Sequence, residues 1–306
     1  MSIQDQFIAF CREHGSQPGL SAKLLHHFGA ELTSAVPKPP LIWLEFNACS
    51  GDSISMLNTV HPELGQIICS LVEVRYWNAL MPAQGKAALE NLLHTAETAN
   101  FILVIEGAIA TAAQGLYCIP FKIDGYSLTS LELIRWLAPR ARFIIAAGTC
   151  ATFGGPSAAR PNPSGSIGVS EIISEPVVNV SGCPINPDWF TGTLFHLLLF
   201  GPPEVDRYQR PTLFYGRTNH TICQRRSYFD SKQFASKLGD PECMISLGCM
   251  GPVTGADCAY RLWNDHLNWP VKASTPCIGC TNPGFPDEST PFFTPLSQKR
   301  PRNDRE

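Results

Sequence analysis

The stretch that decides the fold is LIWLEFNACSGD, residues 41–52, where an apolar run ends shortly before a cysteine and an aspartate. Leu41–Phe46 has the length of a strand and is apolar at nearly every position. A strand of that kind is buried on both faces, which is typical of a parallel sheet covered by helices. In such sheets, ligands bind just beyond the carboxyl ends of the strands. Cys49 and Asp52 therefore lie where a site is expected.

Further apolar runs of strand length follow, and amphipathic stretches separate them. The predicted strands are Leu41–Phe46, Leu71–Val74, Phe101–Ile105, Arg142–Ala147 and Val177–Val180, and the predicted helices are Lys86–Thr98 and Leu128–Leu137. We take Ser127 to open the second helix, with Glu132 inside its early turns. This alternation predicts an α/β fold with a parallel sheet. Because Cys150 and Cys183 also follow strands, they should meet Cys49 at the same edge of the sheet.

Composition divides the chain into four parts. Residues 1–40 form a polar N-terminal extension with some helical pattern, and residues 41–200 form the predicted sheet domain. Beyond this domain, prolines, glycines and aromatic residues become frequent, and six of the twelve cysteines fall between 223 and 280. A segment with so little regular structure needs cross-links, which bound metal can supply. We therefore expect a metal-bearing domain at 201–293 and a short tail at 294–306.

The composition of the 306 residues argues against some classes of partner. Hydrophobic residues make up 44% and charged residues only 16%, which is typical of a subunit that buries surface against another. The net charge of −3 and the lack of a basic stretch argue against a nucleic-acid partner. No apolar run reaches the ~20 residues of a membrane span, and the first residues lack a secretion pattern. We expect a cytoplasmic protein without a transmembrane segment, which would associate with a membrane only through a partner.

Nine cysteines, one histidine and one aspartate form three groups of candidate metal ligands. The groups are Cys49, Asp52, Cys150 and Cys183; His220, Cys223, Cys243 and Cys249; and Cys258, Cys277 and Cys280. Gathered thiolates with one imidazole suit iron–sulfur clusters, and a reducing compartment favours metal over disulfides. Structural zinc is the alternative, although a zinc ribbon needs a second C-x-x-C, which the chain lacks. Of the remaining Cys11, Cys69 and Cys118, we expect Cys69 and Cys118 to pack as small apolar side chains.

Two of the candidate ligands compete with simpler roles. His220 lies three residues before Cys223, whose group otherwise lacks a fourth member; the alternative is an ordinary loop histidine. Asp52 takes the second place of a C-x-x-C spacing, Cys49-Ser-Gly-Asp52, where a carboxylate can bind iron as a harder ligand than a thiolate. The alternative is that Asp52 only caps a helix that opens at Ser53. We favour the ligand role for both residues.

Together these residues resemble the small subunit of nickel–iron hydrogenases from about Leu41 to Phe293. The matching stretches are LIWLEFNACSGD, FILVIEGAIATA, AAGTCATFGG, VSGCPINPDW, RPTLFYGRTNHTIC with RRSYFD, CMISLGCMGPVTGADC and NWPVKASTPCIGCTNPGFP. The resemblance implies a flavodoxin-like first domain followed by an irregular iron–sulfur domain. It also implies an electron-transfer subunit of an uptake hydrogenase, whose large partner subunit splits H2 at a nickel–iron centre.

The resemblance assigns each group of ligands to a cluster. The group with Cys49 and Asp52 matches the proximal site, and the group with His220 matches the distal site, each implying a 4Fe-4S cluster. The group with Cys258 matches the medial site. There Pro270 stands in place of a fourth cysteine, which implies a 3Fe-4S cluster, with 4Fe-4S as the alternative.

The proximal group departs from the family pattern because Asp52 stands where a cysteine is expected. This substitution is similar to that of uptake hydrogenases of the actinobacterial, high-affinity type. The two extra proximal cysteines of oxygen-tolerant membrane-bound enzymes correspond to Gly51 and Gly155, so we expect that mechanism to be absent. The implied partners are the large subunit and an electron acceptor protein or quinone-linked carrier, in one heterodimer or in a dimer of heterodimers.

Three other functions stay open at this point. A hydrogen-sensing regulatory subunit would use the same clusters for signalling, a quinone-reductase subunit would lack the later cysteines, and a structural zinc protein would carry no iron. We expect no catalytic acid or nucleophile in this chain. Glu45 and Glu106 lie near the cluster-bearing edge and are either proton-transfer groups or buried hydrogen-bond acceptors.

Overall fold

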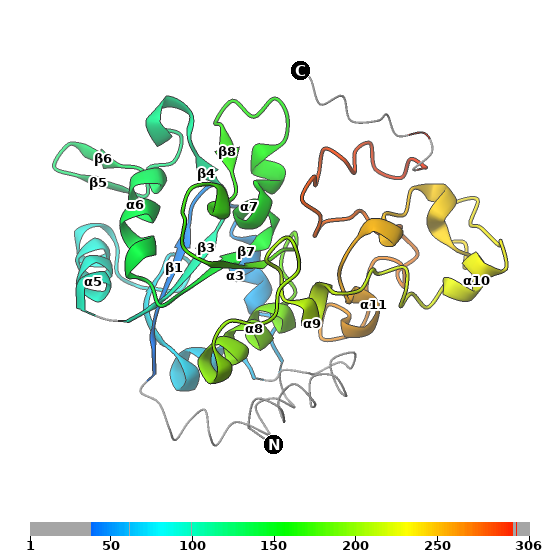
Figure 1. Cartoon of the computed structure of the whole chain (residues 1–306), viewed down its shortest axis with the longest axis horizontal. Helices are drawn as coiled ribbons and strands as arrows, with labels where there is room; N and C mark the ends of the chain where they lie inside the picture. The colour runs from blue at the N-terminus through cyan, green and yellow to red at the C-terminus, as the bar shows by residue number, and fades with distance from the viewer. Residues whose placement is uncertain (1–37, 61, 99, 296–297, 299–306) are drawn as a thin grey trace.

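The computed structural model describes residues 38–60, 62–98, 100–295 and 298, and its centre is a five-stranded sheet (Figure 1). The strands are β1 (Pro40–Glu45), β2 (Glu73–Trp77), β3 (Ile102–Glu106), β7 (Phe143–Ala147) and β9 (Val177–Val180). They run parallel in the spatial order β2-β1-β3-β7-β9. Within this sheet the order is 2-1-3-4-5, which is that of flavodoxin-like folds. The predicted parallel α/β fold is confirmed, and the expected helical pattern before residue 38 lies outside the described residues.

Helices cover both faces of the sheet because its strands are apolar on both sides. Leu41 and Trp43 of β1 belong to the core on one face, whereas Ile42 and Leu44 belong to the core on the other. The first face packs on α3 (Gly51–Met56) and α8 (Pro187–Phe200), and the second on α5 (Gly85–Thr98) and α6 (Ser130–Leu137). Each such buried side chain contributes roughly 1.5–3 kcal/mol, so burial on two faces fixes the layers.

Helix α6 begins at Ser130 rather than at Leu128, so the predicted start at Ser127 is wrong. The N-cap is Thr129, whose hydroxyl accepts from the backbone N–H of Glu132, while the Glu132 carboxylate accepts from the N–H of Thr129. This reciprocal pair is a capping box, and its spacing selects Thr129 over Ser127. The preceding residues form the hairpin of β5 (Phe121–Ile123) and β6 (Tyr126–Leu128).

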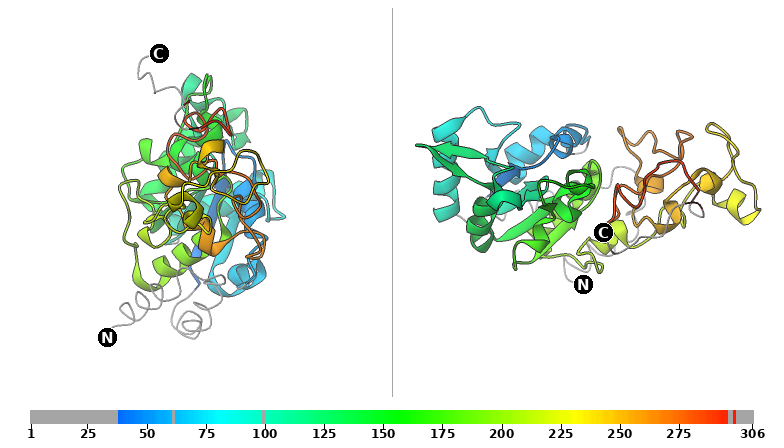
Figure 2. Two further views of the ribbon diagram at one scale, coloured as in Figure 1. Left: turned by 90° about the vertical axis from the view of Figure 1, so that its right-hand side faces the viewer. Right: turned by 90° about the horizontal axis from the view of Figure 1, so that it is seen from above.

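After α8 the described chain changes to short helices, turns and isolated bridges, as expected for the metal-bearing part. Its α-helices are α9 (Thr212–Tyr215), α10 (Arg226–Asp230) and α11 (Cys258–Arg261). The second view of Figure 2 shows this segment beside the sheet domain. The boundaries at residues 200 and 293 stay predictions. No helix in the described ranges combines the length and the apolar character that a bilayer span requires.

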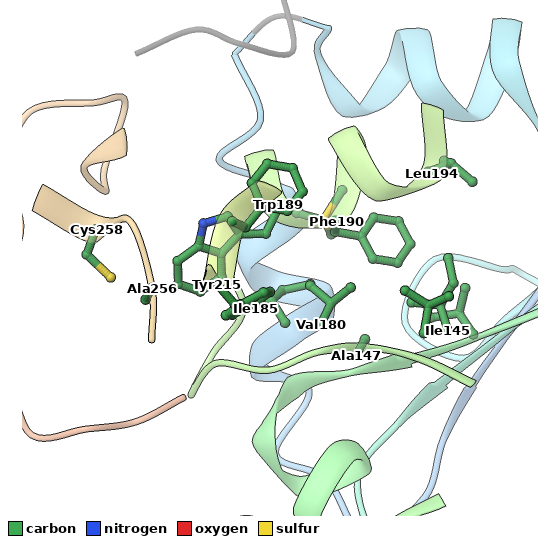
Figure 3. Close-up of a cluster of buried hydrophobic side chains, with 14 of the residues drawn as sticks. Ile145, Ala147, Val180, Ile185, Trp189, Phe190, Leu194, Tyr215, Ala256 and Cys258 are labelled. Atoms are coloured by element: carbon green, nitrogen blue, oxygen red, sulfur yellow. The ribbon is translucent and has the colours of Figure 1, made fainter. Parts of the chain in front are cut away.

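One hydrophobic core joins the two parts of the chain. Figure 3 shows Trp189 of α8 on the side of Tyr215 and Cys258 of the later segment, and Phe190 of α8 on the side of Ile145 of the sheet. The rings of Trp189 and Tyr215 lie 5.2 Å apart. Buried side chains of the later segment therefore pack directly against α8 and the sheet.

A buried ion-pair network reinforces this joint. Arg261 of α11 is fully buried and pairs with Asp257 and, at 3.6 Å, with Asp188 of α8. Asp257 also accepts a 2.6 Å hydrogen bond from the indole N–H of Trp189. Separating these charges would leave an uncompensated charge buried, which is costly. The network therefore fixes how α8 packs against α11.

Glu106, at the end of β3, holds α3 against the sheet. Its side chain is fully buried and accepts hydrogen bonds from Trp43 Nε1 (2.9 Å), the backbone N–H groups of Asp52 (3.0 Å) and Ser53 (3.1 Å), and Ser53 Oγ (2.6 Å). The two amides belong to the first turn of α3, where an anion also opposes the helix dipole. Glu106 is therefore a buried hydrogen-bond acceptor, which was one of its two expected roles.

We expect Glu106→Gln to lower the free energy of unfolding by about 1–3 kcal/mol, because an amide N–H would face a donor where an oxygen now accepts. Chemical denaturation followed by circular dichroism measures the loss. Glu90→Gln on the exposed face of α5 is the matched control and should change stability by less than about 0.5 kcal/mol. Equal losses in the two variants would contradict the role assigned to Glu106.

Candidate metal sites

The proximal group assembles at the carboxyl edge of the sheet, as predicted. Cys49 lies in the loop after β1, Cys150 lies in α7 (Gly148–Phe153) directly after β7, and Cys183 follows β9. Cys49 and Cys183 are exposed, and Cys150 is half-buried. Parallel strands end at one edge, so three loops far apart in sequence meet there.

Short hydrogen bonds tie these loops together. The backbone N–H of Thr149 donates to Gly182 O (2.7 Å), and the N–H of Gly182 donates to Thr149 Oγ1 (3.0 Å). Burial raises the pKa of the Cys183 thiol to about 12, and the charges of Cys280, Cys150, Asp52 and Cys49 add to the rise. The members of the proximal group are therefore close enough to influence one another's ionisation.

Asp52 does not cap α3, so the capping alternative is wrong. The N-cap is Ser50, and no side chain makes a capping hydrogen bond there. Asp52 lies one position inside the helix, and its Oδ1 accepts from the backbone N–H of Ile185 at 2.7 Å. The Asp52 carboxyl group thus reaches across to the loop that carries Cys183.

The surroundings of the Asp52 carboxylate are buried and negative. Burial raises its pKa to about 8, the charges of Glu106 and Glu45 add to the rise, and the bond from Ile185 opposes it. A bound cation would reverse this balance and favour the carboxylate. The site fits a metal with an oxygen ligand for that reason.

Gly148 makes the room for this carboxylate. Its φ is +86°, and a Cβ built at this position would lie 2.0 Å from Asp52 Oδ2. Any side chain at position 148 would therefore displace the Asp52 carboxyl group as well as strain the backbone.

The medial group lies deep in the second part of the chain. Cys258 opens α11, and Cys277 and Cys280 stand on the C-x-x-C loop. Burial raises the pKa of Cys258 well above its ordinary value, and the charges of Cys280 and Cys277 add to the rise. The carbonyl of Cys280 accepts from the Thr149 hydroxyl, which joins this loop to the edge of the sheet.

The distal group brings its three cysteines together beside His220. Burial raises the pKa of Cys223, with contributions from Cys249 and Cys243. The N–H of Cys223 donates to His220 O (3.4 Å), and the N–H of His220 donates to Gly251 O (3.1 Å), two residues beyond Cys249. Burial and Arg226 lower the pKa of His220, which favours the neutral imidazole that binds metals.

The three groups form a row. Cys183 of the proximal group feels the charge of Cys280 in the medial group. Cys277 of the medial group feels the charge of Cys249 in the distal group. A path of neighbouring thiols therefore runs from the edge of the sheet through the buried loop to the distal group.

The donor set fits iron–sulfur clusters. Buried thiols that raise one another's pKa stay protonated unless a cation compensates their charge, and bound metal deprotonates such thiols. Within the described ranges, no three His, Cys, Asp or Glu side chains converge as the ligands of a single metal ion do. The ligands of a cluster bind different iron atoms and therefore stand further apart.

The remaining cysteines have mixed outcomes. Cys118 is half-buried and packs against the core, as predicted. Cys69 is exposed, so its predicted packing is wrong: in the π-helix Ile67–Leu71, the two end residues face the core and Cys69 faces outward. Cys11 lies outside the described residues.

Gly51 and Gly155, the positions that correspond to the two extra cysteines of oxygen-tolerant enzymes, leave little space for a side chain. A Cβ at Gly51 would lie 3.0 Å from Cys49 Sγ, and a Cβ at Gly155, whose φ is +49°, would lie 2.8 Å from the backbone nitrogen of Cys150. A cavity of about 350 Å³ lies elsewhere, between α5 and the β5–β6 hairpin, and its wall contains no cysteine. It belongs to none of the three groups.

Sequence reasoning missed the polar groups that approach the sulfur atoms. Ser157 Oγ lies 3.6 Å from Cys150 Sγ, the N–H of Arg225 lies 3.4 Å from Cys223 Sγ, and Asn219 Nδ2 lies 3.9 Å from Cys277 Sγ. Ligand spacing carries no signal for such contacts, because they depend on how the loops pack.

Two family models match the chain. Residues 215–293 match the model of the C-terminal part of the NiFe/NiFeSe hydrogenase small subunit. Residues 49–197 match the model of the NADH ubiquinone oxidoreductase 20 Kd subunit.

Individual proteins are similar over nearly the whole chain. The periplasmic NiFeSe hydrogenase small subunit of Desulfomicrobium baculatum is 38% identical, over 94% of this chain and 97% of that protein. The uptake hydrogenase small subunit of Afipia carboxidovorans is 33% identical, over 93% of this chain and 78% of that protein.

Solved structures show the same likeness. A NiFeSe hydrogenase chain of Dm. baculatum superposes with a TM-score of 0.81 at 39% identity, over 85% of this chain and all of that one. The actinobacterial-type NiFe-hydrogenase from Ralstonia eutropha H16 gives a TM-score of 0.79 at 30% identity, over 88% and 86% of the two chains.

We expect Gly148→Ala to lower the free energy of unfolding by more than the ~1 kcal/mol that positive φ alone costs alanine. The added loss comes from the collision with Asp52. Gly125→Ala is the matched control, because its φ is +85° and a Cβ there meets nothing within 4 Å. Denaturation of both variants, alone and combined with Asp52→Ala, measures the contact. Equal losses at the two glycines would contradict it.

Proposed function

The chain belongs to the small-subunit family of nickel–iron hydrogenases, and from this premise we propose that it conducts electrons from H2 oxidation in the large subunit to an acceptor. The row of three thiol groups is the observation that carries the proposal. Iron–sulfur clusters bound there would supply one-electron carriers at short intervals. The protein's own residues hold the ligands in place and keep the order of the row.

We assign the ligands by group. Cys49, Asp52, Cys150 and Cys183 would hold the proximal 4Fe-4S cluster, and His220, Cys223, Cys243 and Cys249 the distal one. The three thiols of the medial group suit a 3Fe-4S cluster. The raised pKa values of the thiols support these assignments, because each group needs the positive charge of iron to ionise fully.

The large subunit would cover the proximal edge. Cys49 and Cys183 are exposed there, and on the adjoining helix α3 the side chains of Ile54 and Leu57 are 58% and 60% exposed. A cluster at this edge needs shelter from water, and apolar side chains favour burial against a partner. Electrons would enter the chain at this edge and leave it beyond the distal group.

The uptake role is supported by the A. carboxidovorans relative, which is named an uptake hydrogenase small subunit. The expected cytoplasmic location has no support from the D. baculatum relative, which is periplasmic by name. An acceptor protein or quinone-linked carrier and a dimer of heterodimers stay part of the proposal. None of the relatives reported above is named as a sensor.

The function is tested on the purified pair of small and large subunits. The wild-type pair should reduce an external dye with H2, and His220→Ala should lower dye reduction at least tenfold while leaving H/D isotope exchange on the large subunit nearly unchanged. The reason is that only the last ligand group is damaged. His220→Cys should keep most of the activity because a thiolate replaces the imidazole.

His94→Ala, on the exposed face of α5, is the control and should change neither activity. Equal loss of dye reduction and isotope exchange in His220→Ala would contradict the role at the exit. A wild-type pair that contains no iron would contradict the function itself.

Asp52→Asn tests the oxygen ligand. Asparagine keeps the acceptor for the Ile185 N–H, so this contact between α3 and the Cys183 loop should remain. The anionic oxygen is lost, so the proximal EPR signal should change and iron content should fall. Asp52→Cys should restore a four-thiolate site. Asp124→Asn, in the exposed hairpin turn, is the control. An unchanged spectrum in Asp52→Asn would leave a site with three cysteine ligands only.

A further inference from the structure

Asn219 occupies a fixed place between the medial and distal groups. Its backbone N–H donates to Thr254 O at 2.9 Å, and the neighbouring Thr218 forms an antiparallel bridge with Gly255. The loop of residues 250–255, which contains Thr254, also holds a medial cysteine in place, because the N–H of Met250 donates to Cys277 O at 2.7 Å. One loop therefore positions both Asn219 and the medial thiol.

The Asn219 side chain is buried beside that thiol. It is 1% exposed, and its Nδ2 lies 3.9 Å from Cys277 Sγ. Its Oδ1 is buried without a hydrogen-bond partner. Buried amide oxygens are nearly always paired, so an asparagine here costs folding energy that an apolar residue of the same size would not. This cost points to a role at the sulfur atom.

A donor aimed at a ligand sulfur changes the redox balance of a cluster. Reduction adds negative charge, which spreads onto the ligand sulfur atoms, and an N–H group directed at the sulfur stabilises that charge. Hydrogen bonds to ligand sulfurs are one of the factors that set cluster potentials. Cys277 is also the medial thiol that feels the charge of Cys249 in the distal group. The contact between Asn219 and Cys277 therefore lies on the side of the medial group that faces the distal group.

We propose that Asn219 raises the reduction potential of the medial cluster by donating its side-chain N–H to the sulfur of Cys277. The inference rests on the proposed electron-transfer function and adds a residue that tunes it. Asn219 binds no metal and acts only through the ligand. It keeps the medial site easier to reduce, so that electrons leave the proximal site without delay.

The test uses redox-poised EPR of the purified heterodimer. Asn219→Leu keeps the size of the side chain and removes the amide. At a fixed potential near the medial midpoint, the ratio of reduced to oxidised medial cluster should fall about fivefold, the equivalent of one hydrogen bond. The proximal and distal midpoints should stay where they are. Stability should not fall, because the unpaired Oδ1 is removed together with the donor.

Asn179→Leu is the matched control. The Oδ1 of Asn179 is likewise buried without a hydrogen-bond partner, but its Nδ2 donates to Tyr208 O (2.8 Å) rather than to a sulfur, so the medial midpoint should not move. Asn219→Asp, which places an anion beside Cys277, should lower the reduced fraction further than leucine does.

Two outcomes would overturn the inference. The first is an unchanged medial midpoint in Asn219→Leu with normal iron content, and the second is a shift to higher potential, which would mean that the carbonyl oxygen faces the sulfur. A wild-type heterodimer without iron would instead refute the proposed function, so the two failures are distinguishable.

Discussion

Thr149 is the point on which the arrangement of the three groups depends. It is 1% exposed, exchanges two hydrogen bonds with Gly182 and donates its hydroxyl to the carbonyl of Cys280. One residue thus joins the ends of β7 and β9 to the C-x-x-C loop. A second bond joins the same two parts of the chain: the hydroxyl of Ser181, just after β9, donates to Thr281 O at 3.0 Å, next to Cys280. These bonds fix the register of the buried loop on the edge of the sheet, which apolar contacts alone would not do.

The apolar strands explain why the sheet was predictable from sequence. Leu41–Phe46 and Phe101–Ile105 are buried on both faces, so their composition alone identifies them, and these two observed strands differ from the predictions by one residue. The predicted strand Leu71–Val74 is wrong in its bounds: Leu71 still belongs to the preceding π-helix, and the strand is Glu73–Trp77. Polar detail was less predictable. Ser127 and Thr129 are both good N-caps, and only the reciprocal bond with Glu132 separates them. Local pattern likewise indicated apolar surroundings for Cys69, although the turn of its helix places it outside.

The ligand groups were predictable as sets because cysteine is rare and strand ends share an edge. What lay beyond prediction were contacts between residues distant in the chain. Asp52 bonds to Ile185, 133 positions later, and Glu106 accepts from α3, more than fifty positions earlier. No spacing rule reports such pairs. They arise only when two loops pack, and they decide whether a carboxylate acts as a cap, an acceptor or a candidate ligand.

Helix α8 packs against both the sheet and the later segment, and this limits how the fold can be recombined. One side packs on the sheet, while Trp189 also packs against Tyr215 and bonds to Asp257 of the later segment. Residues 49–197, the part of the sheet domain that follows β1, match a family model that does not extend into the later segment. A chain that kept this domain and dropped the later segment would need another polypeptide, or a set of polar substitutions, over Trp189. The sheet and its helices can therefore occur without the later segment only if another surface covers the side of α8 that carries Trp189.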